Sequence, residues 1–355
     1  MNAQKRGTSR AALLLLGLAL GAASQVRADC PPSLPAWQMN DPQALVAPDT
    51  PKPPAALRTY HPAKNGVVGY CVYQPALWFR NAPQGIVFYN HGAQLAEDGG
   101  YDPMLRYLAQ AGYYVIYPEL PVYDMAGWPG HSLKALQAGL AQLRSQGVQV
   151  SRLAVAGHSL GAATATQVAA LWQGSPAIGA IILHEPAGRY FYEGWNWQQF
   201  TLNPAGLARI SGSTYLLIVQ AQSSQGDQNS SAHPIWDALP QIPKLDAQGK
   251  FRKNFLLLPD DVSHQNRYPY AVRASDHLTV LAKPLNSMDH YGYWRPTVEA
   301  LYEAFHAGQT GSPGYSAFCN SSSKAGVCKS VRYTGAWKID GVEATELKNA
   351  ADLGL

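Results

Sequence analysis

Short apolar runs rich in β-branched and aromatic residues alternate with longer, helix-like stretches through most of the chain. The short runs have the length and composition of buried strands. They predict strands at Gly85–Tyr89, Tyr113–Tyr117, Leu153–Ala156, Ala180–Leu183, Tyr215–Val219 and Asn254–Leu258. The longer stretches predict helices at Asp102–Gln110, His131–Gln146, Leu160–Trp172 and Pro296–His306. This alternation is typical of an α/β fold, in which helices on both faces join the strands of a mostly parallel sheet.

One segment between two predicted strands is unusually aromatic. Arg189 to Phe200 holds six aromatic residues in twelve positions. As an insertion over the carboxyl ends of the strands it would wall an apolar pocket, because ligands of open α/β sheets bind there. The alternative is a lid helix that packs its aromatic side chains inward. Residues 189–213 are therefore a possible lid, and Trp195 is a candidate pocket residue.

The N-terminus has the pattern of a cleavable signal peptide. Lys5, Arg6 and Arg10 precede an apolar run at 11–23, and Val26-Arg27-Ala28 gives the small-x-small ending of a cleavage site. The run is well short of the ~20 residues that cross a bilayer, so a permanent membrane span is not expected. We expect cleavage near Ala28 and a secreted or periplasmic protein.

Removal of this leader changes the charge balance. Residues 1–28 hold four of the 27 Lys and Arg residues and none of the 23 Asp and Glu residues, so the mature chain would be formally neutral. A nucleic-acid-binding protein carries a basic surface, and no run of Lys or Arg follows the leader. Nucleic acid is therefore not an expected partner.

The mature chain is long enough for one large α/β domain with insertions. Residues 29–60 are rich in proline, which lacks the N–H that a sheet requires, and are predicted to form an extended lead-in. The main domain is expected at 61–310, and a C-terminal extension at 311–355.

The four cysteines indicate disulfide bonds more than a metal site. No Cys-x-x-Cys pair or zinc-finger histidine spacing is present, and an exported chain folds in an oxidising compartment. Four cysteines allow three connectivities. We favour Cys319–Cys328, which are close in sequence, and then Cys30–Cys71; buried thiols are the alternative.

The clearest chemical motif is Gly-His-Ser-Leu-Gly, with Ser159 at its centre. It joins the predicted strand ending at Ala156 to a helix rich in small residues. A serine nucleophile requires this arrangement, since its hydroxyl must be exposed on a sharp, strained turn from which Gly157 and Gly161 remove side chains. The following helix directs its positive N-terminal end at the developing oxyanion. Ser159 is therefore the candidate nucleophile.

A second element is the strand that ends in His91-Gly92. In a serine hydrolase of this pattern, the loop after that strand donates one backbone N–H to the oxyanion, and the residue after the nucleophile donates the other. These positions assign the two donors to Ala93 and Leu160. Gly92 and His158 are expected beside them at the substrate pocket. A plain strand-terminating turn is the alternative for His91-Gly92.

Together these motifs resemble the α/β-hydrolase superfamily over nearly all of the mature chain. The resemblance implies the order serine, acid, histidine along the sequence. His277, in Ala-Ser-Asp-His-Leu, is similar to the turn that presents the catalytic histidine in cutinase-like enzymes, and is the favoured base. His264, followed by Gln265, resembles the equivalent turn of lipoprotein-associated phospholipases (platelet-activating-factor acetylhydrolase-like esterases). His290 fits aromatic packing before the last helix better.

Two acidic residues compete for the third position. Glu185 directly follows a predicted strand, and its segment Leu-His-Glu-Pro-Ala resembles the Leu-Asp-Pro-Val turn of chlorophyllase-type hydrolases. Asp227 lies in the loop after the next strand, where many members of the superfamily carry the acid, but it comes several residues late. Either carboxylate can orient an imidazole and stabilise its protonated form. Glu185 is favoured.

These residues predict an exported carboxylic-ester hydrolase that acts on an apolar or polymeric acyl substrate through an acyl-enzyme intermediate. Amide or peptide cleavage, or acyl transfer, would use the same nucleophile. A binding protein that retains the fold without turnover is the third possibility. The reaction requires no metal or cofactor, and no His pair at i, i+4 or acidic loop predicts a metal site.

Overall fold

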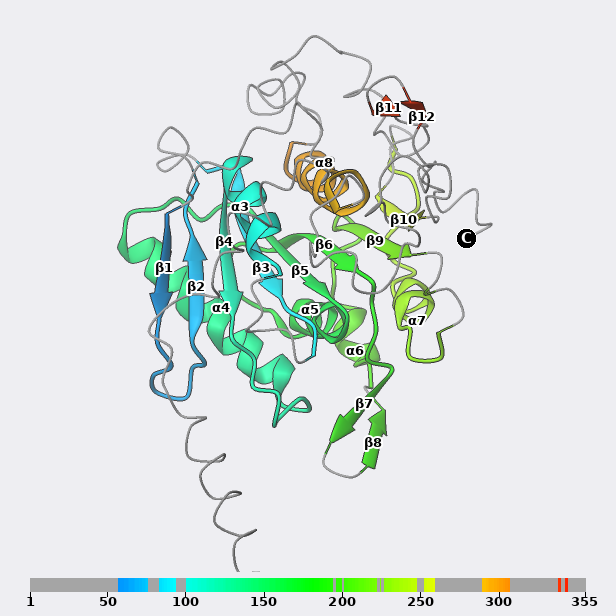
Figure 1. Cartoon of the computed structure of the whole chain (residues 1–355), viewed down its shortest axis with the longest axis horizontal. Coiled ribbons are helices and arrows are strands. Elements are labelled where there is room, and N and C mark those ends of the chain that lie inside the picture. The colour runs from blue at the N-terminus through cyan, green and yellow to red at the C-terminus, as the bar shows by residue number, and fades with distance from the viewer. Residues whose placement is uncertain are drawn as a thin grey trace, which may run out of the picture.

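The computed structural model describes residues 57–75, 83–93, 100–193, 196–199, 201–221, 224, 227–247, 252–258, 289–306, 338–339 and 342–343. An eight-stranded sheet forms the centre of this part of the chain, in the order β1-β2-β4-β3-β5-β6-β9-β10 (Figure 1). The strands are β1 Arg58–His61, β2 Tyr70–Tyr73, β3 Gly85–Asn90, β4 Tyr113–Pro118, β5 Leu153–His158, β6 Ile178–His184, β9 Tyr215–Ala221 and β10 Lys253–Leu258. From β4 to β10 each strand is parallel to its neighbour. β2 is antiparallel to both of its neighbours, β1 and β4.

All six predicted strands and all four predicted helices are confirmed. Each observed strand extends the predicted run by one to three residues, because hydrogen bonding to a neighbour continues past the apolar positions. The helices are α3 Asp102–Gln110, α4 Trp128–Ser145, α5 Leu160–Leu171 and α8 Arg295–Phe305. The predicted start of α4 at His131 is three residues late, since a proline at its first turn begins the helix earlier.

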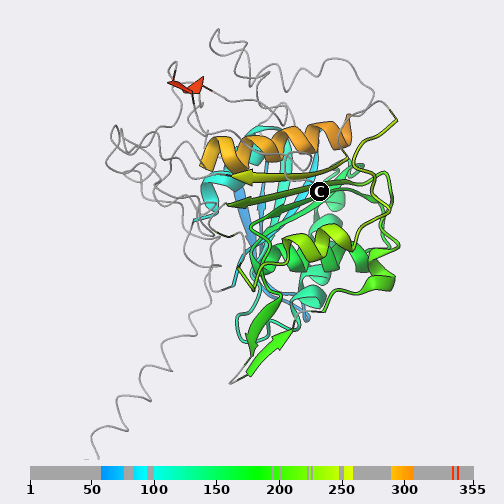
Figure 2. The same ribbon diagram turned by 90° about the vertical axis from the view of Figure 1, so that its right-hand side faces the viewer.

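Helices cover both faces of the sheet, as the sequence predicts (Figure 2). One hydrophobic cluster joins α3 and α8 to one face, and a second joins α4 and α5 to the other. The short helices α6, Pro204–Leu207, and α7, Ala232–Asp237, belong to the second cluster. Because side chains alternate along a strand, each central strand contributes to both layers. The sheet is therefore buried on both faces.

Helix α5 is buried along almost its whole length. Its sequence, Leu-Gly-Ala-Ala-Thr-Ala-Thr-Gln-Val-Ala-Ala-Leu, keeps side chains small where the helix meets the sheet. A Cβ atom at Gly161 would collide with the backbone of Asn90 and His91 at the end of β3. The small residues thus allow the helix to approach the sheet closely, which places its N-terminus beside the loop that follows β3.

The sequence pattern missed the antiparallel edge made by β1 and β2. Each strand has only four residues, which is too short for a distinct periodic signal. β1 starts at Arg58, inside the last residues assigned to the proline-rich lead-in. Cys71 is fully buried in β2 and is disulfide-bonded. Cys30, Cys319 and Cys328 lie outside the described residues, so the favoured pairing stays a prediction.

The aromatic segment is a β-hairpin, so the lid-helix alternative is wrong. β7, Tyr190–Glu193, pairs antiparallel with β8, Asn196–Gln199. Aromatic residues at successive positions favour extended backbone, and tight pairing over four residues satisfies its hydrogen bonds. The hairpin projects away from the sheet beyond the carboxyl ends of the strands (Figure 1). Trp195 lies outside the described residues.

The chain reaches α8 through a six-residue π-helical segment, η4, Asp289–Trp294. Further along, β11, Lys338–Ile339, pairs with β12, Val342–Glu343. Within the described ranges, no helix combines the length and apolar character that a membrane crossing requires.

Candidate active site

Ser159 lies on the sharp turn between β5 and α5. Its backbone has φ 56° and ψ −126°, a conformation that L-residues rarely adopt. Such a conformation costs of order 1–3 kcal/mol and persists only where surrounding contacts hold it. Its N–H donates to the carbonyl of His184 (3.0 Å), and its own carbonyl accepts from Ala162 (3.0 Å) and Ala187 (3.2 Å). The strained turn is therefore tied both to its own helix and to the segment that follows β6.

The two flanking glycines are required by close packing. A Cβ atom at Gly157 would collide with the backbone of Gly161 and Ala162, and one at Gly161 would collide with the carbonyl oxygens of Asn90 and His91. Both collisions involve backbone atoms, of helix α5 in the first case and of the end of β3 in the second, so no side-chain rotation can relieve them. This is the physical reason for the Gly-x-Ser-x-Gly spacing in this chain.

The loop after β3 approaches Ser159 from the other side. A Cβ atom at Gly92 would lie 3.0 Å from the Cβ of Ser159. Ala93 and Leu160, the two predicted oxyanion donors, belong to one small apolar cluster. Among the described residues, no hydrogen bond uses the N–H of either residue. The N–H of Gly92 instead donates to the hydroxyl of Tyr101 (2.8 Å).

His91 and His158 support this loop from inside. Both are fully buried. Nδ1 of His158 hydrogen-bonds to the hydroxyl of Tyr101 (2.6 Å), so the ring lies beneath the loop and offers no exposed surface to a ligand. His91 donates from Nδ1 to the carbonyl of Gly92 (2.7 Å) and accepts at Nε2 from the N–H of Leu120 (2.9 Å). Burial lowers the pKa of His91 to about 4, so its ring is neutral near pH 7.

Glu185 is brought next to Ser159 by the parallel pairing of β5 with β6, in which His158 is opposite His184. Glu185 is 1% exposed and has a φ of 47°, the second strained residue of the site. Its N–H donates to the carbonyl of Val219 (2.8 Å). Its Oε1 accepts from the N–H of Ala221 and the hydroxyl of Tyr293, each at 2.5 Å.

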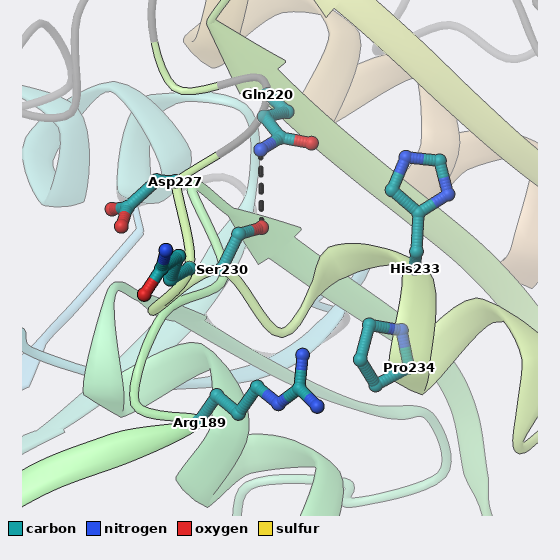
Figure 3. Close-up of a pocket in the computed structure, with 7 residues that line it drawn as sticks. Arg189, Gln220, Asp227, Ser230, His233 and Pro234 are labelled. Carbon is teal, nitrogen blue, oxygen red and sulfur yellow. Dashed lines mark hydrogen bonds between the residues drawn. The ribbon is translucent and has the colours of Figure 1, made fainter.

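Asp227 has a different environment. It is exposed, and its Oδ1 accepts from the N–H of Asn229 (2.9 Å), a local turn contact. It lines a polar pocket of about 290 Å³ with Arg189, Gln220, Gln228, Ser230, His233 and Pro234. Figure 3 shows its carboxylate pointing away from the other labelled side chains, while the amide of Gln220 donates to Ser230 (3.1 Å). Of the two candidate acids, only Glu185 is buried beside the serine turn.

The structure does not place the candidate base. His277 and His264 lie outside the described residues, between β10 and η4. His290 belongs to η4, but its side chain is not described. Among the described residues, no cluster of three or more His, Cys, Asp or Glu side chains has a metal-binding arrangement.

His184, which precedes Glu185, is a buried neutral histidine. The hydroxyl of Thr297 donates to the carbonyl of Tyr293 (2.6 Å), so it can only accept from Nε2–H of His184 (2.8 Å). Nδ1 of His184 then accepts from the hydroxyl of Tyr89 (3.2 Å). Burial lowers the pKa of His184 to about 3. The sequence indicated nothing of this network, because its members come from β3, β6 and α8.

Replacement of His184 tests this assignment through the pH dependence of stability. Below pH 6.5 the unfolded chain binds a proton at His184 that the folded chain does not, so stability falls as pH decreases from 6.5 toward 3. The contribution is about 1.4 kcal/mol per pH unit in this window. The free energy of unfolding, measured with urea at several pH values between 6.0 and 4.5, should fall with decreasing pH. We expect this fall per pH unit to be smaller by that amount in His184→Gln than in the wild type. An equal slope in both proteins would contradict a neutral buried His184.

Comparisons with known proteins agree with the fold. The sequence matches no protein-family model and no curated protein. Among solved structures, the chain is similar to an esterase from Rhizomucor miehei, with a TM-score of 0.51 and 13% identity over 71% of this chain and 85% of that one. It also matches Thermogutta terrifontis esterase 2, with a TM-score of 0.40 and 16% identity over 59% of this chain and 85% of that one.

The strand order, the two helical layers and the strand-turn-helix around Ser159 together define the fold. The chain has the α/β-hydrolase fold.

Proposed function

We propose that this protein is an exported serine hydrolase that cleaves carboxylic esters with Ser159 as its nucleophile. One observation carries the proposal: Ser159 occupies a strained turn at the carboxyl end of a central parallel strand, with a helix N-terminus behind it and a buried carboxylate beside it. An ordinary tight turn requires neither the strain nor the adjacent buried acid. The fold alone does not assign an activity, so the argument rests on this site.

In the proposed reaction, Oγ of Ser159 attacks the ester carbonyl and transfers its proton to the imidazole of the base. The N–H groups of Ala93 and Leu160 stabilise the negative charge on the carbonyl oxygen. The imidazole then protonates the leaving alcohol, and an acyl-enzyme remains. Water attacks the acyl group, gives a proton to the imidazole and releases the acid, while the proton returns to Ser159.

We assign the base to His277, with His264 as the alternative, and the acid to Glu185. The carboxylate would hold the imidazole in the tautomer that accepts the serine proton and would stabilise the imidazolium. The aromatic hairpin β7–β8, which projects beyond the carboxyl ends of the strands, is proposed to border the acyl site. This position suits an apolar or polymeric acyl group.

A fluorophosphonate probe tests the nucleophile and the base together. The probe reacts only with an activated serine, so we expect labelling of the mature wild-type protein and of His264→Ala. Ser159→Ala and His277→Ala should remain unlabelled, because one lacks the hydroxyl and the other the proton acceptor. Mass spectrometry of the labelled peptide identifies the modified residue.

The outcomes separate the alternatives. Labelling lost in His264→Ala and retained in His277→Ala would move the base to His264. An unlabelled wild-type protein without esterase activity would overturn the proposed function and favour a binding protein. Where labelling occurs, a panel of matched p-nitrophenyl esters and p-nitroanilides distinguishes ester from amide cleavage, and added alcohol as acceptor detects acyl transfer.

A further inference from the structure

The segment before α8 places a tyrosine hydroxyl on the candidate acid. Tyr293 is fully buried, and its hydroxyl donates to Oε1 of Glu185 at 2.5 Å. The two residues are 108 positions apart in sequence. A buried hydrogen bond to a carboxylate is stronger than one between neutral groups and fixes the direction of both partners. This contact links η4 directly to the site.

The backbone of Tyr293 is itself held in place. Its carbonyl accepts from the hydroxyl of Thr297 (2.6 Å), which accepts from His184, the residue before Glu185. The ring of His184 also packs edge-on against the ring of Tyr293, with centroids 5.5 Å apart. Two connections therefore join η4 to the end of β6, one through the tyrosine hydroxyl and one through its carbonyl.

The π-helical turn η4 positions the side chain of Tyr293. A π-helix contains an extra residue relative to an α-helix, which rotates the side chains before it around the helix axis, and such turns are frequent at functional sites. η4 ends at Trp294 and α8 continues directly from Arg295. The six-residue turn thus delivers Tyr293 to the sheet at the point where Glu185 leaves β6.

Two donors to Glu185 among the described residues act on the same oxygen. Oε1 accepts from Ala221 and from Tyr293, so an imidazole N–H of the catalytic base would bind at the other oxygen, Oε2. A carboxylate held at one oxygen by two donors cannot rotate about its terminal bond without losing both. Fixing that rotation fixes where the imidazole must lie.

We propose that Tyr293 is a positioning residue, which holds the Glu185 carboxylate in the orientation that the catalytic histidine requires. This inference rests on the proposed function and deepens it. Tyr293 does not touch substrate; it acts through Glu185. Its loss therefore lowers turnover and leaves substrate binding nearly unchanged.

The test compares Tyr293→Phe with a matched control. Phenylalanine keeps the buried ring and removes only the hydroxyl. Tyr73 provides the control, because it is equally buried and its hydroxyl also donates to a buried carboxylate, Asp102 (3.1 Å), between β2 and α3. With p-nitrophenyl butyrate we expect kcat to fall about 10- to 100-fold in Tyr293→Phe with KM within about twofold, and Tyr73→Phe to retain wild-type kcat.

A double-mutant cycle with Glu185→Gln distinguishes positioning from general destabilisation. If Tyr293 acts through Glu185, adding Tyr293→Phe to Glu185→Gln changes kcat by less than about twofold, because residues that act as a unit are not additive. Losses that multiply would overturn the inference. Glu185→Asp, which withdraws the carboxylate from both donors, should also lower kcat, and full activity in that variant would likewise overturn it.

Failure of this inference is distinct from failure of the proposed function. A wild-type protein labelled at Ser159, with Tyr293→Phe turning over at the wild-type rate, overturns the positioning role alone. A wild-type protein with neither labelling nor turnover overturns both. Labelling and turnover measured together therefore distinguish a wrong role for Tyr293 from a wrong proposed function.

Discussion

Replacing Ser159 by alanine is expected to lower kcat by about 10⁶-fold, the loss seen when a member of a comparable triad is removed. In the proposed mechanism the hydroxyl of Ser159 is the attacking group, and alanine has no atom that could replace it. The backbone contacts that hold the turn use the N–H and carbonyl of residue 159, which alanine retains. The thermal unfolding temperature should therefore stay within a few degrees of the wild-type value. Steady-state kinetics and a thermal melt measure the two effects.

Ser231→Ala is a suitable control for this variant. Ser231 is also buried and lies close to the site, where its hydroxyl donates to the carbonyl of Ala187 (3.2 Å). It has no role in the proposed chemistry, so its replacement should cost stability without comparable loss of kcat. Substantial esterase activity in pure Ser159→Ala would rule out Ser159 as the nucleophile.

Replacing Glu185 by glutamine should have the second largest effect, a loss of about 10⁴-fold in kcat. The amide has nearly the shape of the carboxylate but lacks its charge, and it favours the wrong tautomer of the histidine. Asp227→Asn should stay within about twofold of the wild type, because Asp227 is exposed and bonds only within its own turn among the described contacts. Steady-state kinetics give kcat for both variants, and thermal melts check that the two are equally stable.

The opposite result would also be informative. Near-normal turnover in Glu185→Gln, together with collapse in Asp227→Asn, would move the acid to the loop after β9. The proposal that Ser159 is the nucleophile would be unaffected. In that case the strained conformation of Glu185 would serve only the packing of β6 against β9.

The alternation of apolar runs and helix-like stretches was enough to predict the fold. Six parallel strands and four helices were predicted because each buries apolar residues at its own period, which is a local property of the sequence. The edge strands β1 and β2 and the hairpin β7–β8 were missed. Their runs of four residues are too short for periodicity, and their formation depends on a pairing partner.

The sequence by itself also determined the sharp turn at Ser159. Gly157, Ser159 and Gly161 lie within five residues, and the requirement for a sharp turn with no side chains beside it is read directly from their spacing. The strained backbone of Ser159 agrees with that reading. A local motif of this kind needs only a strand before it and a helix after it to be interpreted.

Only the tertiary structure distinguished Glu185 from Asp227 and revealed Tyr293. A sequence shows two acidic residues after two strands, but it does not show that one is buried at a strained position while the other faces solvent. The hydroxyl of Tyr293 meets Glu185 across 108 residues, through the approach of η4 to the ends of β6 and β9. Burial and long-range hydrogen bonds arise from the packing of whole elements, and no local pattern encodes them.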